Sequence, residues 1–243
     1  MTVVNLGGEA FALRNPTVEY EDVILPEDVT AWVVGQVEAT VLARHQSPHV
    51  PRWTAGGSPL ELPHNRALRD RALARLAGMP VVDLGCGGPE STDPFQAFIK
   101  PFNPKLYVGV NHVATYGYRP WHEVPQFGIV TPFSADYGDP LPGAIVRGDM
   151  LRVLSRLPDN SISIALNGID RAILPPDLPY GKAVAAEITR VAHPEGLVFG
   201  VTLNGGILST LAEAESFTGA AVPIEIANTT AADGFYFLQK VAA

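Results

Sequence analysis

Small and polar residues follow four apolar segments that the sequence predicts as buried strands. The four sets, in chain order, are Gly85-Cys86-Gly87-Gly88 after residues 80–84, Asn111-His112 after 106–110, Gly148-Asp149-Met150 after 144–146, and Asn167-Gly168-Ile169-Asp170 after 161–166. Backbone amides in a glycine-rich turn can approach a ligand closely, because no side chains block them. Carboxylate and amide oxygens accept hydrogen bonds, and a histidine can remove a proton from a substrate. These residues therefore predict a binding site for a polar ligand.

The elements that must position these residues alternate along the chain. Helices are predicted between the strand segments, over residues 150–157, 181–192 and 206–216. Alternation favours a parallel sheet with helices on both faces, and ligands bind outside the carboxyl ends of such strands. A fifth apolar segment lies at 197–202, and residues 222–228 and 235–241 predict an antiparallel hairpin at the sheet edge. The predicted fold is α/β, a three-layer sandwich with a doubly wound, mostly parallel seven-stranded sheet and an antiparallel last strand.

The composition indicates a large folded domain. The chain has 243 residues, of which 47% are hydrophobic and 17% are charged, a balance typical of globular proteins. The formal net charge of −8 argues against a nucleic-acid groove, which requires clustered lysines and arginines. Four arginines that lie close together on a predicted helix favour a solvated face instead; they are Arg66, Arg69, Arg71 and Arg75.

The sequence predicts a cytoplasmic protein without a membrane partner. Cys86 is the only cysteine, so no disulfide can form within the chain, which fits a reducing compartment. Residues 1–10 lack the pattern of a signal peptide, and no segment approaches the roughly 20 apolar residues that span a bilayer.

Two parts are expected within one compact unit. Residues 1–79 are predicted to form an N-terminal helical or lid segment, and residues 80–243 the sheet domain. The N-terminal part is expected to hold helices over 26–44 and 63–77, with short strands or extended arms at 3–6 and 18–25.

The stretch 112–143 is an insertion longer than a simple crossover needs. It carries the aromatic residues Tyr116, Tyr118, Trp121, Phe127, Phe133 and Tyr137. Rings in an extended loop must be buried somewhere. One hypothesis is that the stretch folds over the carboxyl edge of the sheet and, with the N-terminal helices, forms an apolar pocket for a small-molecule substrate. The other is a protein interface, such as that of a homodimer.

Four segments together resemble the motifs of the class I, Rossmann-like methyltransferases that use S-adenosylmethionine (SAM). They are Val82-Asp83-Leu84-Gly85-Cys86-Gly87, Val108-Gly109-Val110-Asn111, Arg147-Gly148-Asp149-Met150 with Leu157–Ser161, and Glu187–Gly196. The resemblance covers roughly residues 80–241. It implies methyl transfer from SAM, with S-adenosylhomocysteine (SAH) as the product. The acidic charge and the absence of an Asn-Pro-Pro-Tyr-type tetrapeptide favour a small or medium-sized organic acceptor.

The resemblance also implies roles for individual residues. Gly85 and Gly87, with Cys86 between them, would lie against the methionine and ribose parts of SAM. Asp83 would orient this turn and the amino group of the ligand. The other implied contacts are Asn111 with the ribose hydroxyls, Asp149 with the adenine amino group, Met150 with the adenine ring and Asn167 with the methyl-donor end.

Three features depart from the family's pattern, and one of them is a first crossover helix that Pro101 is expected to end early. Pro89 stands where the family has a third glycine, and proline has no backbone N–H to donate. Asn111 replaces an acid and lacks the charge that strengthens hydrogen bonds to hydroxyls. Two alternatives stay open: a catalytically inactive binding or scaffold protein, and an enzyme with another reaction on the same fold. A dinucleotide site is less favoured, because Glu90 occupies the third glycine position of that fingerprint.

Methyl transfer mainly requires alignment of a nucleophile and sometimes removal of its proton. The candidate bases are His112, His122 and Asp170, each of which has a simpler reading as a capping, turn or surface residue. Cys86 is expected to be a small packed residue beneath the turn rather than a nucleophile. The sequence shows no metal-ligand spacing, such as two histidines at i and i+4 with a third ligand.

Overall fold

The computed structural model describes the greater part of the predicted sheet domain and shorter pieces of the N-terminal part. The described residues are 2–6, 9–13, 19–20, 59–86, 95–111, 141–147, 150–166, 179–202, 206–223 and 234–242. The predicted helix over 26–44 and most of the 112–143 insertion lie outside them.

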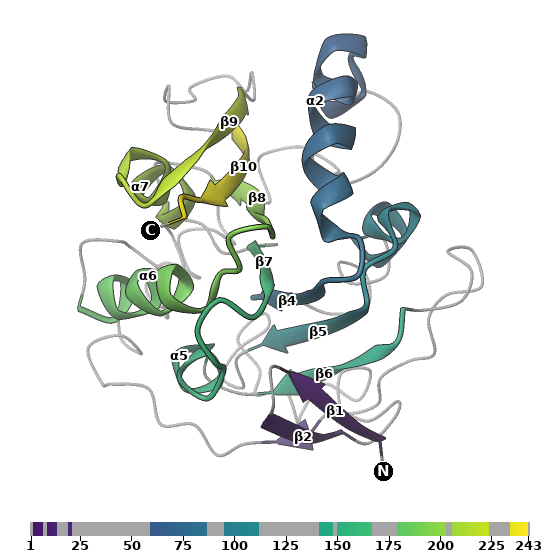
Figure 1. The fold of residues 1–243 in the computed structure, drawn as a ribbon, viewed down its shortest axis with the longest axis vertical. Helices are drawn as coiled ribbons and strands as arrows, with labels where there is room; N and C mark the ends of the chain where they lie inside the picture. The colour runs from purple at the N-terminus through teal and green to yellow at the C-terminus, as the bar shows by residue number, and fades with distance from the viewer. Residues whose placement is uncertain are drawn as a thin grey trace, which may run out of the picture.

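A twisted sheet with the strand order β3-β6-β5-β4-β7-β8-β10-β9 forms the centre of the molecule (Figure 1). Its strands are β3 (Glu19–Tyr20), β4 (Pro80–Leu84), β5 (Leu106–Asn111), β6 (Gly143–Arg147), β7 (Ser163–Leu166), β8 (Val198–Thr202), β9 (Phe217–Pro223) and β10 (Gly234–Lys240). The pairs from β3 through β8 are parallel, whereas β10 pairs antiparallel with both β8 and β9. The predicted parallel sheet with an antiparallel last strand is confirmed.

The N-terminal segment adds strands beyond the seven predicted from the apolar segments. β3 pairs with Val146 and Arg147 at the end of β6 and makes an eighth strand of the sheet. β1 (Thr2–Leu6) and β2 (Glu9–Leu13) form a separate antiparallel pair. β1 matches the predicted strand at 3–6, but β2 was not predicted. β3 lies within the short strand or extended arm predicted at 18–25. Its place in the sheet was not predicted, because two residues are too short to show a period.

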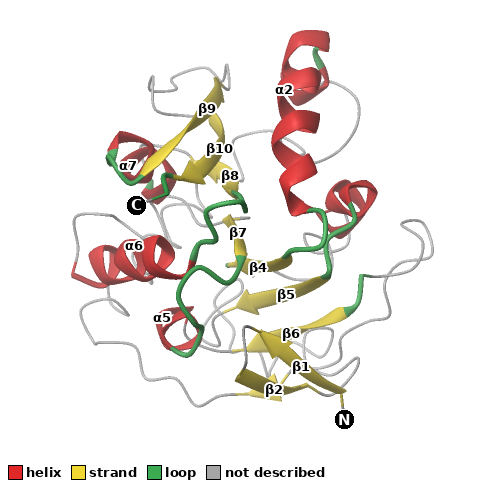
Figure 2. Cartoon of the chain, in the orientation of Figure 1, coloured by secondary structure: helices red, strands yellow, loops and turns green. Residues whose placement is uncertain are grey.

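Helices cover both faces of the sheet, as Figure 2 shows in red. They are η1 (Pro59–Glu61), α2 (Pro63–Leu73), η2 (Ala74–Leu76), a helical segment over 95–99, η3 (Lys100–Phe102), α5 (Met150–Ser155), α6 (Pro179–Val191) and α7 (Ile207–Glu213). The helices predicted over 63–77, 150–157, 181–192 and 206–216 are therefore present with bounds shifted by a few residues. None of the helices among the described residues is long and apolar enough to cross a membrane.

Alternate residues of each central strand enter two separate cores. One core joins Val82, Leu84, Val108 and Val110 to side chains of α5, α6 and α7, among them Val153, Ile188 and Leu208. The other joins Val81, Tyr107, Ala165 and Phe199 to Leu60, Leu73, Leu76, Phe95 and Ile99. Strands buried on both faces show continuous apolar runs rather than alternation. The two cores establish the predicted three-layer arrangement.

The segment before residue 79 takes part in the second core. Leu60, Leu73 and Leu76 are almost fully buried there, although they precede the predicted boundary. α2 begins with Pro63 at its first turn, where the missing N–H costs nothing, and it continues into η2. Residues 59–76 therefore contribute to one helical layer on the sheet. The division into an N-terminal helical or lid segment over 1–79 and a sheet domain over 80–243 stays a prediction.

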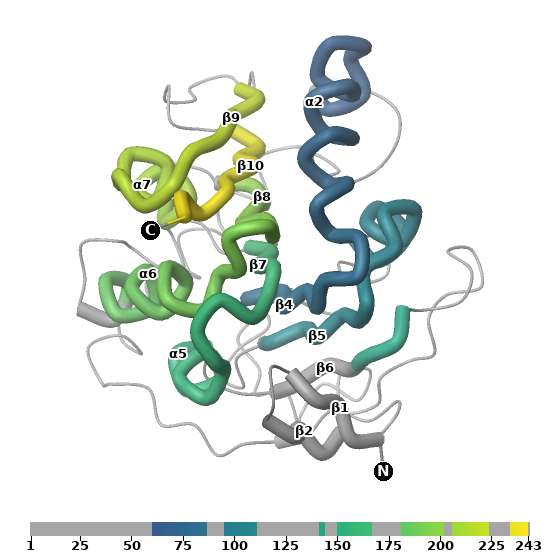
Figure 3. The backbone as a smooth tube through the Cα atoms, viewed as in Figure 1, coloured from purple at the N-terminus to yellow at the C-terminus, as the bar shows by residue number. Residues whose placement is uncertain are grey.

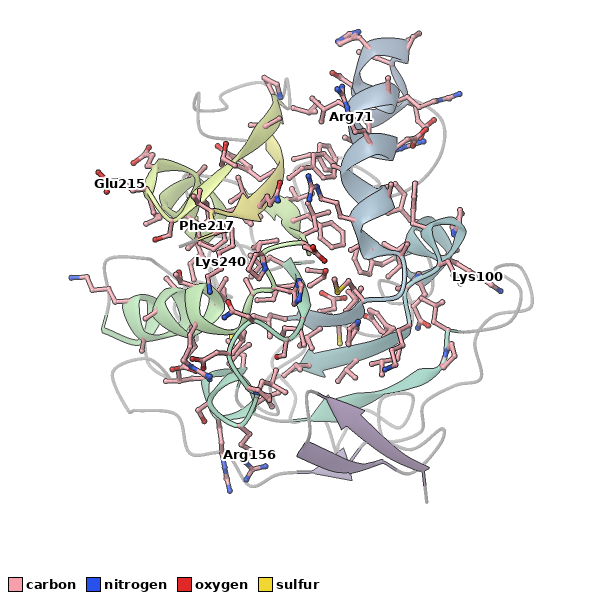
Figure 4. The ribbon with its side chains drawn as sticks, viewed as in Figure 1. Arg71, Lys100, Arg156, Glu215, Phe217 and Lys240 are labelled. Carbon is pink, nitrogen blue, oxygen red and sulfur yellow. The ribbon has the colours of Figure 1, made fainter. Side chains whose placement is uncertain are left out.

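The four arginines of α2 and η2 do not all lie on a solvated face. Arg66, Arg71 and Arg75 are exposed, and Figure 4 labels Arg71 on α2. Arg69 is different: its side chain is 13% exposed and forms ion pairs with Glu61 and Asp70. Its guanidinium carbon also lies 5.8 Å from the centre of the Phe98 ring. The prediction of four solvated arginines is wrong for Arg69, because the ring and two carboxylates compensate its burial.

Arg190, near the end of α6, holds together elements at the amino edge of the sheet. Its guanidinium donates to the backbone oxygens of Leu154 (2.9 Å) and Leu157 (2.8 Å), which lie at the end of α5 and just after it. It also forms ion pairs with Glu187 (2.5 Å) and Asp159 (2.6 Å). The hydrogen bond with Glu187, followed by that with Asp159, raises the pKa of Arg190.

The end of β10 joins the same network. Lys240 Nζ donates to Asn160 Oδ1 at 2.7 Å and to the backbone oxygen of Arg190 at 3.3 Å. Figure 4 shows Lys240 between Phe217 and α6. Burial lowers the pKa of Lys240. The network thus links the last strand to α6.

Replacing Arg190 with methionine is expected to lower the free energy of unfolding by about 1–3 kcal/mol, because the hydrogen bonds to two partly buried carbonyl oxygens and the ion pairs with Glu187 and Asp159 are lost. Lys182→Ala on the exposed side of the same helix is the control, with an expected change within about 0.5 kcal/mol. Urea unfolding of the two variants measures the difference. Equal effects of both substitutions would show that the Arg190 network contributes little to stability.

Candidate functional site

Strand β4 lies at the point where the winding of the sheet reverses. The chain passes from β4 to β5 and β6 on one side, then crosses back to enter β7 and β8 on the other (Figure 3). Ligands of open α/β sheets bind at the carboxyl ends of the strands beside such a switch point. Asp83 and Gly85 stand at the carboxyl end of β4, so the predicted ligand-binding edge coincides with this point.

Asp83 is a fully buried carboxylate near the end of β4. The hydroxyl of Tyr107, in β5, donates a hydrogen bond of 2.6 Å to its Oδ2. The register places Gly109 directly opposite Asp83 on β5 and Ala165 opposite it on β7. Because these neighbours are small, space remains on this face for the carboxylate and the Tyr107 side chain. A buried carboxylate requires such donors.

The turn after β4 is anchored to the end of β5. Gly85 has a φ of +73°, a conformation that favours glycine. The backbone N–H groups of Gly85 and Cys86 both donate to the oxygen of Val110, at 2.8 and 3.1 Å. These two amides therefore fix the turn and are engaged within the protein. Cys86 is fully buried, as expected for a small residue packed beneath the turn.

Two further predicted residues are described, one at the end of a strand and one at the start of a helix. Asn111 is the last residue of β5 and pairs with Arg147 at the end of β6. Met150 is the first residue of α5 and is 8% exposed, packed in the core shared with α6 and α7. The structure thus brings the positions of Asp83, Gly85, Cys86 and Asn111 to one edge of adjacent strands.

Six of the predicted site residues lie outside the described residues, and their predictions stay untested. They are Gly87, His112, His122, Asp149, Asn167 and Asp170. Among the residues that the structure does describe, no group of three or more His, Cys, Asp or Glu side chains lies together in a way that could hold a metal ion.

Tyr107 was not predicted as part of the site. One signal in the sequence could have indicated it. An acid in an apolar strand needs a hydrogen-bond donor, and Tyr107 is the only residue of the predicted strand 106–110 with a polar side chain. The structure shows that this tyrosine reaches Asp83.

A search of solved structures finds methyltransferases with a similar arrangement of elements at low identity. A proposed RNA methyltransferase from Pyrococcus horikoshii is 13% identical, with 89% of this chain and 98% of that chain covered and a TM-score of 0.41. A proposed methyltransferase from Streptococcus mutans, in complex with SAH, is 10% identical, with 75% and 99% covered and a TM-score of 0.42. The O-methyltransferase TomG from Streptomyces achromogenes, in complex with SAM, is 14% identical, with 91% and 92% covered and a TM-score of 0.45. No family model and no curated protein matches the sequence.

The turn after β4 can be tested with two glycines that share the same positive φ. Gly85 and Gly78 flank β4 and both have a φ of +73°. Alanine at either position is strained by about 1–2 kcal/mol, and a Cβ at Gly78 has no other atom within 4 Å. We expect Gly85→Ala to weaken SAH binding roughly tenfold, as about 1.4 kcal/mol implies, and Gly78→Ala to leave it unchanged. Isothermal titration measures both; similar affinities in the two variants would separate the turn from ligand binding.

Proposed function

We propose that the chain is a SAM-dependent methyltransferase that acts on a small or medium-sized organic substrate. One observation carries the proposal. A buried carboxylate, Asp83, and a glycine in the left-handed region, Gly85, occupy the carboxyl end of the strand at the switch point of a doubly wound sheet. Both residue types stand where the resemblance to class I methyltransferases assigns them.

The described residues fit an adenosyl ligand at this edge. Asp83 supplies a carboxyl group that can accept from the amino group of SAM, and within the protein it already accepts a hydrogen bond from the Tyr107 hydroxyl. Gly85 gives the turn a path close to the strand end without a Cβ. Gly87, Asn111, Asp149, Met150 and Asn167 complete the proposed contacts. Met150 is largely packed in the core, so only a small part of its side chain would support the adenine ring.

Bound SAM supplies a methyl group on a positively charged sulfur, which is already a good electrophile. The chain then has two tasks: to align the acceptor atom with that methyl group and, where the acceptor is protonated, to remove a proton. His112, His122 and Asp170 are the proposed bases. In the sequence His112 directly follows Asn111, the last residue of β5.

A small-molecule acceptor is favoured over a nucleic acid by the charge of the chain. The formal net charge is −8, and Arg69 is occupied by ion pairs. Phosphate binding requires several lysines or arginines turned toward one groove. The three similar structures do not select a substrate, since one is described as acting on RNA and another as an O-methyltransferase of tomaymycin synthesis.

An assay with methyl-labelled SAM tests the function and the acceptor class together. The purified protein is incubated with SAM and either a low-molecular-weight metabolite extract or purified RNA, and SAH is measured. We expect SAH to form with the metabolite extract and not with RNA. Labelled RNA would overturn the acceptor class. SAH binding without turnover on either would favour an inactive binding protein or another reaction on this fold.

A further inference from the structure

Tyr107 contacts the chain on both sides of the glycine-rich segment. Its hydroxyl bonds Asp83, which lies two positions before Gly85. Its ring lies 6.1 Å from that of Phe95, with an angle of 53° between the ring planes, and Phe95 begins the described part of the helix that follows. The buried side chain of Tyr107 therefore contacts both Asp83, before the glycine-rich segment, and Phe95, in the helical residues 95–99 after it.

The surroundings of Tyr107 restrict its movement. The side chain is 2% exposed. Phe95 stacks in turn on Phe199 of β8, at 5.9 Å and 26°. The backbone N–H of Tyr107 donates to the oxygen of Pro142, just before β6. A hydroxyl held this firmly can fix the direction of the carboxylate that accepts from it, because little conformational freedom is left to lose.

The backbone of β5 reinforces the same connection. Three residues after Tyr107, the oxygen of Val110 accepts from both Gly85 and Cys86. Side-chain and backbone groups of one strand thus hold Asp83, Gly85 and Cys86 together. Loss of the Tyr107 hydroxyl would leave the backbone contacts in place and remove one hydrogen bond that fixes the Asp83 carboxylate.

We propose that Tyr107 is a positioning residue: it holds the Asp83 carboxylate and the Phe95 helix in fixed relation to the turn at Gly85, and thereby sets the affinity for the adenosyl ligand. The part that concerns the ligand rests on the proposed function. The part that concerns the turn does not rest on the proposed function, and the protein contains a residue whose reactivity measures local opening of the turn. Cys86 is the only cysteine of the chain and is fully buried within this turn. Its thiol reacts with a reagent in solution only when the turn opens locally.

The experiment compares Tyr107→Phe with Tyr236→Phe. Each removes one buried hydroxyl and keeps the ring, but Tyr236 lies on β10, separated from β4 by β7 and β8. Labelling of Cys86 by an aromatic disulfide reagent is followed in the ligand-free protein under native conditions. We expect Tyr107→Phe to raise the labelling rate about tenfold, in line with the loss of a hydrogen bond to a charged group, and Tyr236→Phe to leave it unchanged.

Ligand binding is measured on the same proteins. We expect Tyr107→Phe to raise the dissociation constant of SAH about tenfold, with a smaller change in kcat than in the KM for SAM once an acceptor is known. Adding Tyr107→Phe to Asp83→Asn should change the affinity little further, because the hydroxyl acts through the carboxylate. A merely structural role of Tyr107 predicts additive effects instead. If Tyr107→Phe does not fold, Phe95→Leu disturbs the ring contact and should also raise the labelling rate.

Each result decides one part. Unchanged labelling of Cys86 in Tyr107→Phe overturns the proposal. Faster labelling with unchanged SAH affinity overturns its ligand part. If Tyr107→Phe raises the labelling rate of Cys86 but the wild-type protein does not bind SAH, Tyr107 fixes the turn and the proposed function is overturned. Faster labelling together with weaker, non-additive SAH binding supports the whole proposal.

Discussion

Replacing Asp83 with asparagine is expected to weaken SAH binding roughly 10- to 100-fold. The carboxylate is fully buried at the switch point of the sheet, and asparagine has nearly the same shape without the charge. Hydrogen bonds to charged groups contribute about 1.5–3 kcal/mol, and each 1.4 kcal/mol is a factor of ten in affinity. SAH carries an amino group but no sulfonium, so its titration isolates the contribution of Asp83 to the amino-acid end of the ligand. Isothermal titration measures the change.

A second buried polar residue provides the control for Asp83→Asn. Ser163 lies at the start of the adjacent strand β7, on the same sheet face, is fully buried, and accepts a hydrogen bond of 3.1 Å from the N–H of Leu197. Ser163→Ala is expected to lower the free energy of unfolding by about 1 kcal/mol and to leave SAH affinity unchanged. If both variants bind SAH as tightly as the wild type, Asp83 has no part in holding the ligand.

The largest expected loss of stability comes from Gly143→Ala. Gly143 begins β6, pairs with Tyr107 of β5 and has a φ of +146°. A Cβ at this position would lie 1.7 Å from the backbone oxygen of Tyr107. Because backbone atoms cannot move aside as a flexible side chain can, β6 would have to separate from β5. We expect a loss of about 3 kcal/mol or more in the free energy of unfolding.

Thermal unfolding of Gly143→Ala beside Gly78→Ala separates the clash from backbone strain. Gly78 also has a positive φ, but a Cβ there meets no atom within 4 Å. At about 2–4 °C per kcal/mol for a chain of this size, Gly143→Ala should melt roughly 10 °C below the wild type, and Gly78→Ala only a few degrees below. Equal shifts would mean that strand β6 accommodates the added methyl group and that the close approach at Gly143 is not obligatory.

The central strands could be predicted because strands that are buried on both faces consist of a continuous run of apolar residues. This holds for β4, β5 and β8, whose residues enter one core or the other. The predicted start of β9 was wrong: the strand begins at Phe217 rather than at Val222. Its residues 218–221 are small and mostly exposed, so they carry little strand preference of their own. Pairing with β10 decides their conformation.

The candidate site could be predicted only where polar or glycine residues interrupt an apolar run. Asp83 and Gly85 end an apolar run, and an acid or a glycine in such a place is visible in the sequence. The hydrogen bond between Tyr107 and Asp83 is different, because it depends on the register of β4 and β5, which places Val81 opposite Tyr107. Register is set by tertiary packing, and a sequence segment read alone does not specify it.

Asp83 and Gly85 lie at the carboxyl end of β4, beside the switch point of the sheet. The proposed function follows only if an adenosyl ligand is held there. Calorimetric titration of SAH into the wild-type protein tests this most directly. We predict one binding site per chain with a dissociation constant in the micromolar range, on the order of −8 kcal/mol. The absence of binding at millimolar SAH would contradict the account and leave the α/β architecture without the proposed ligand.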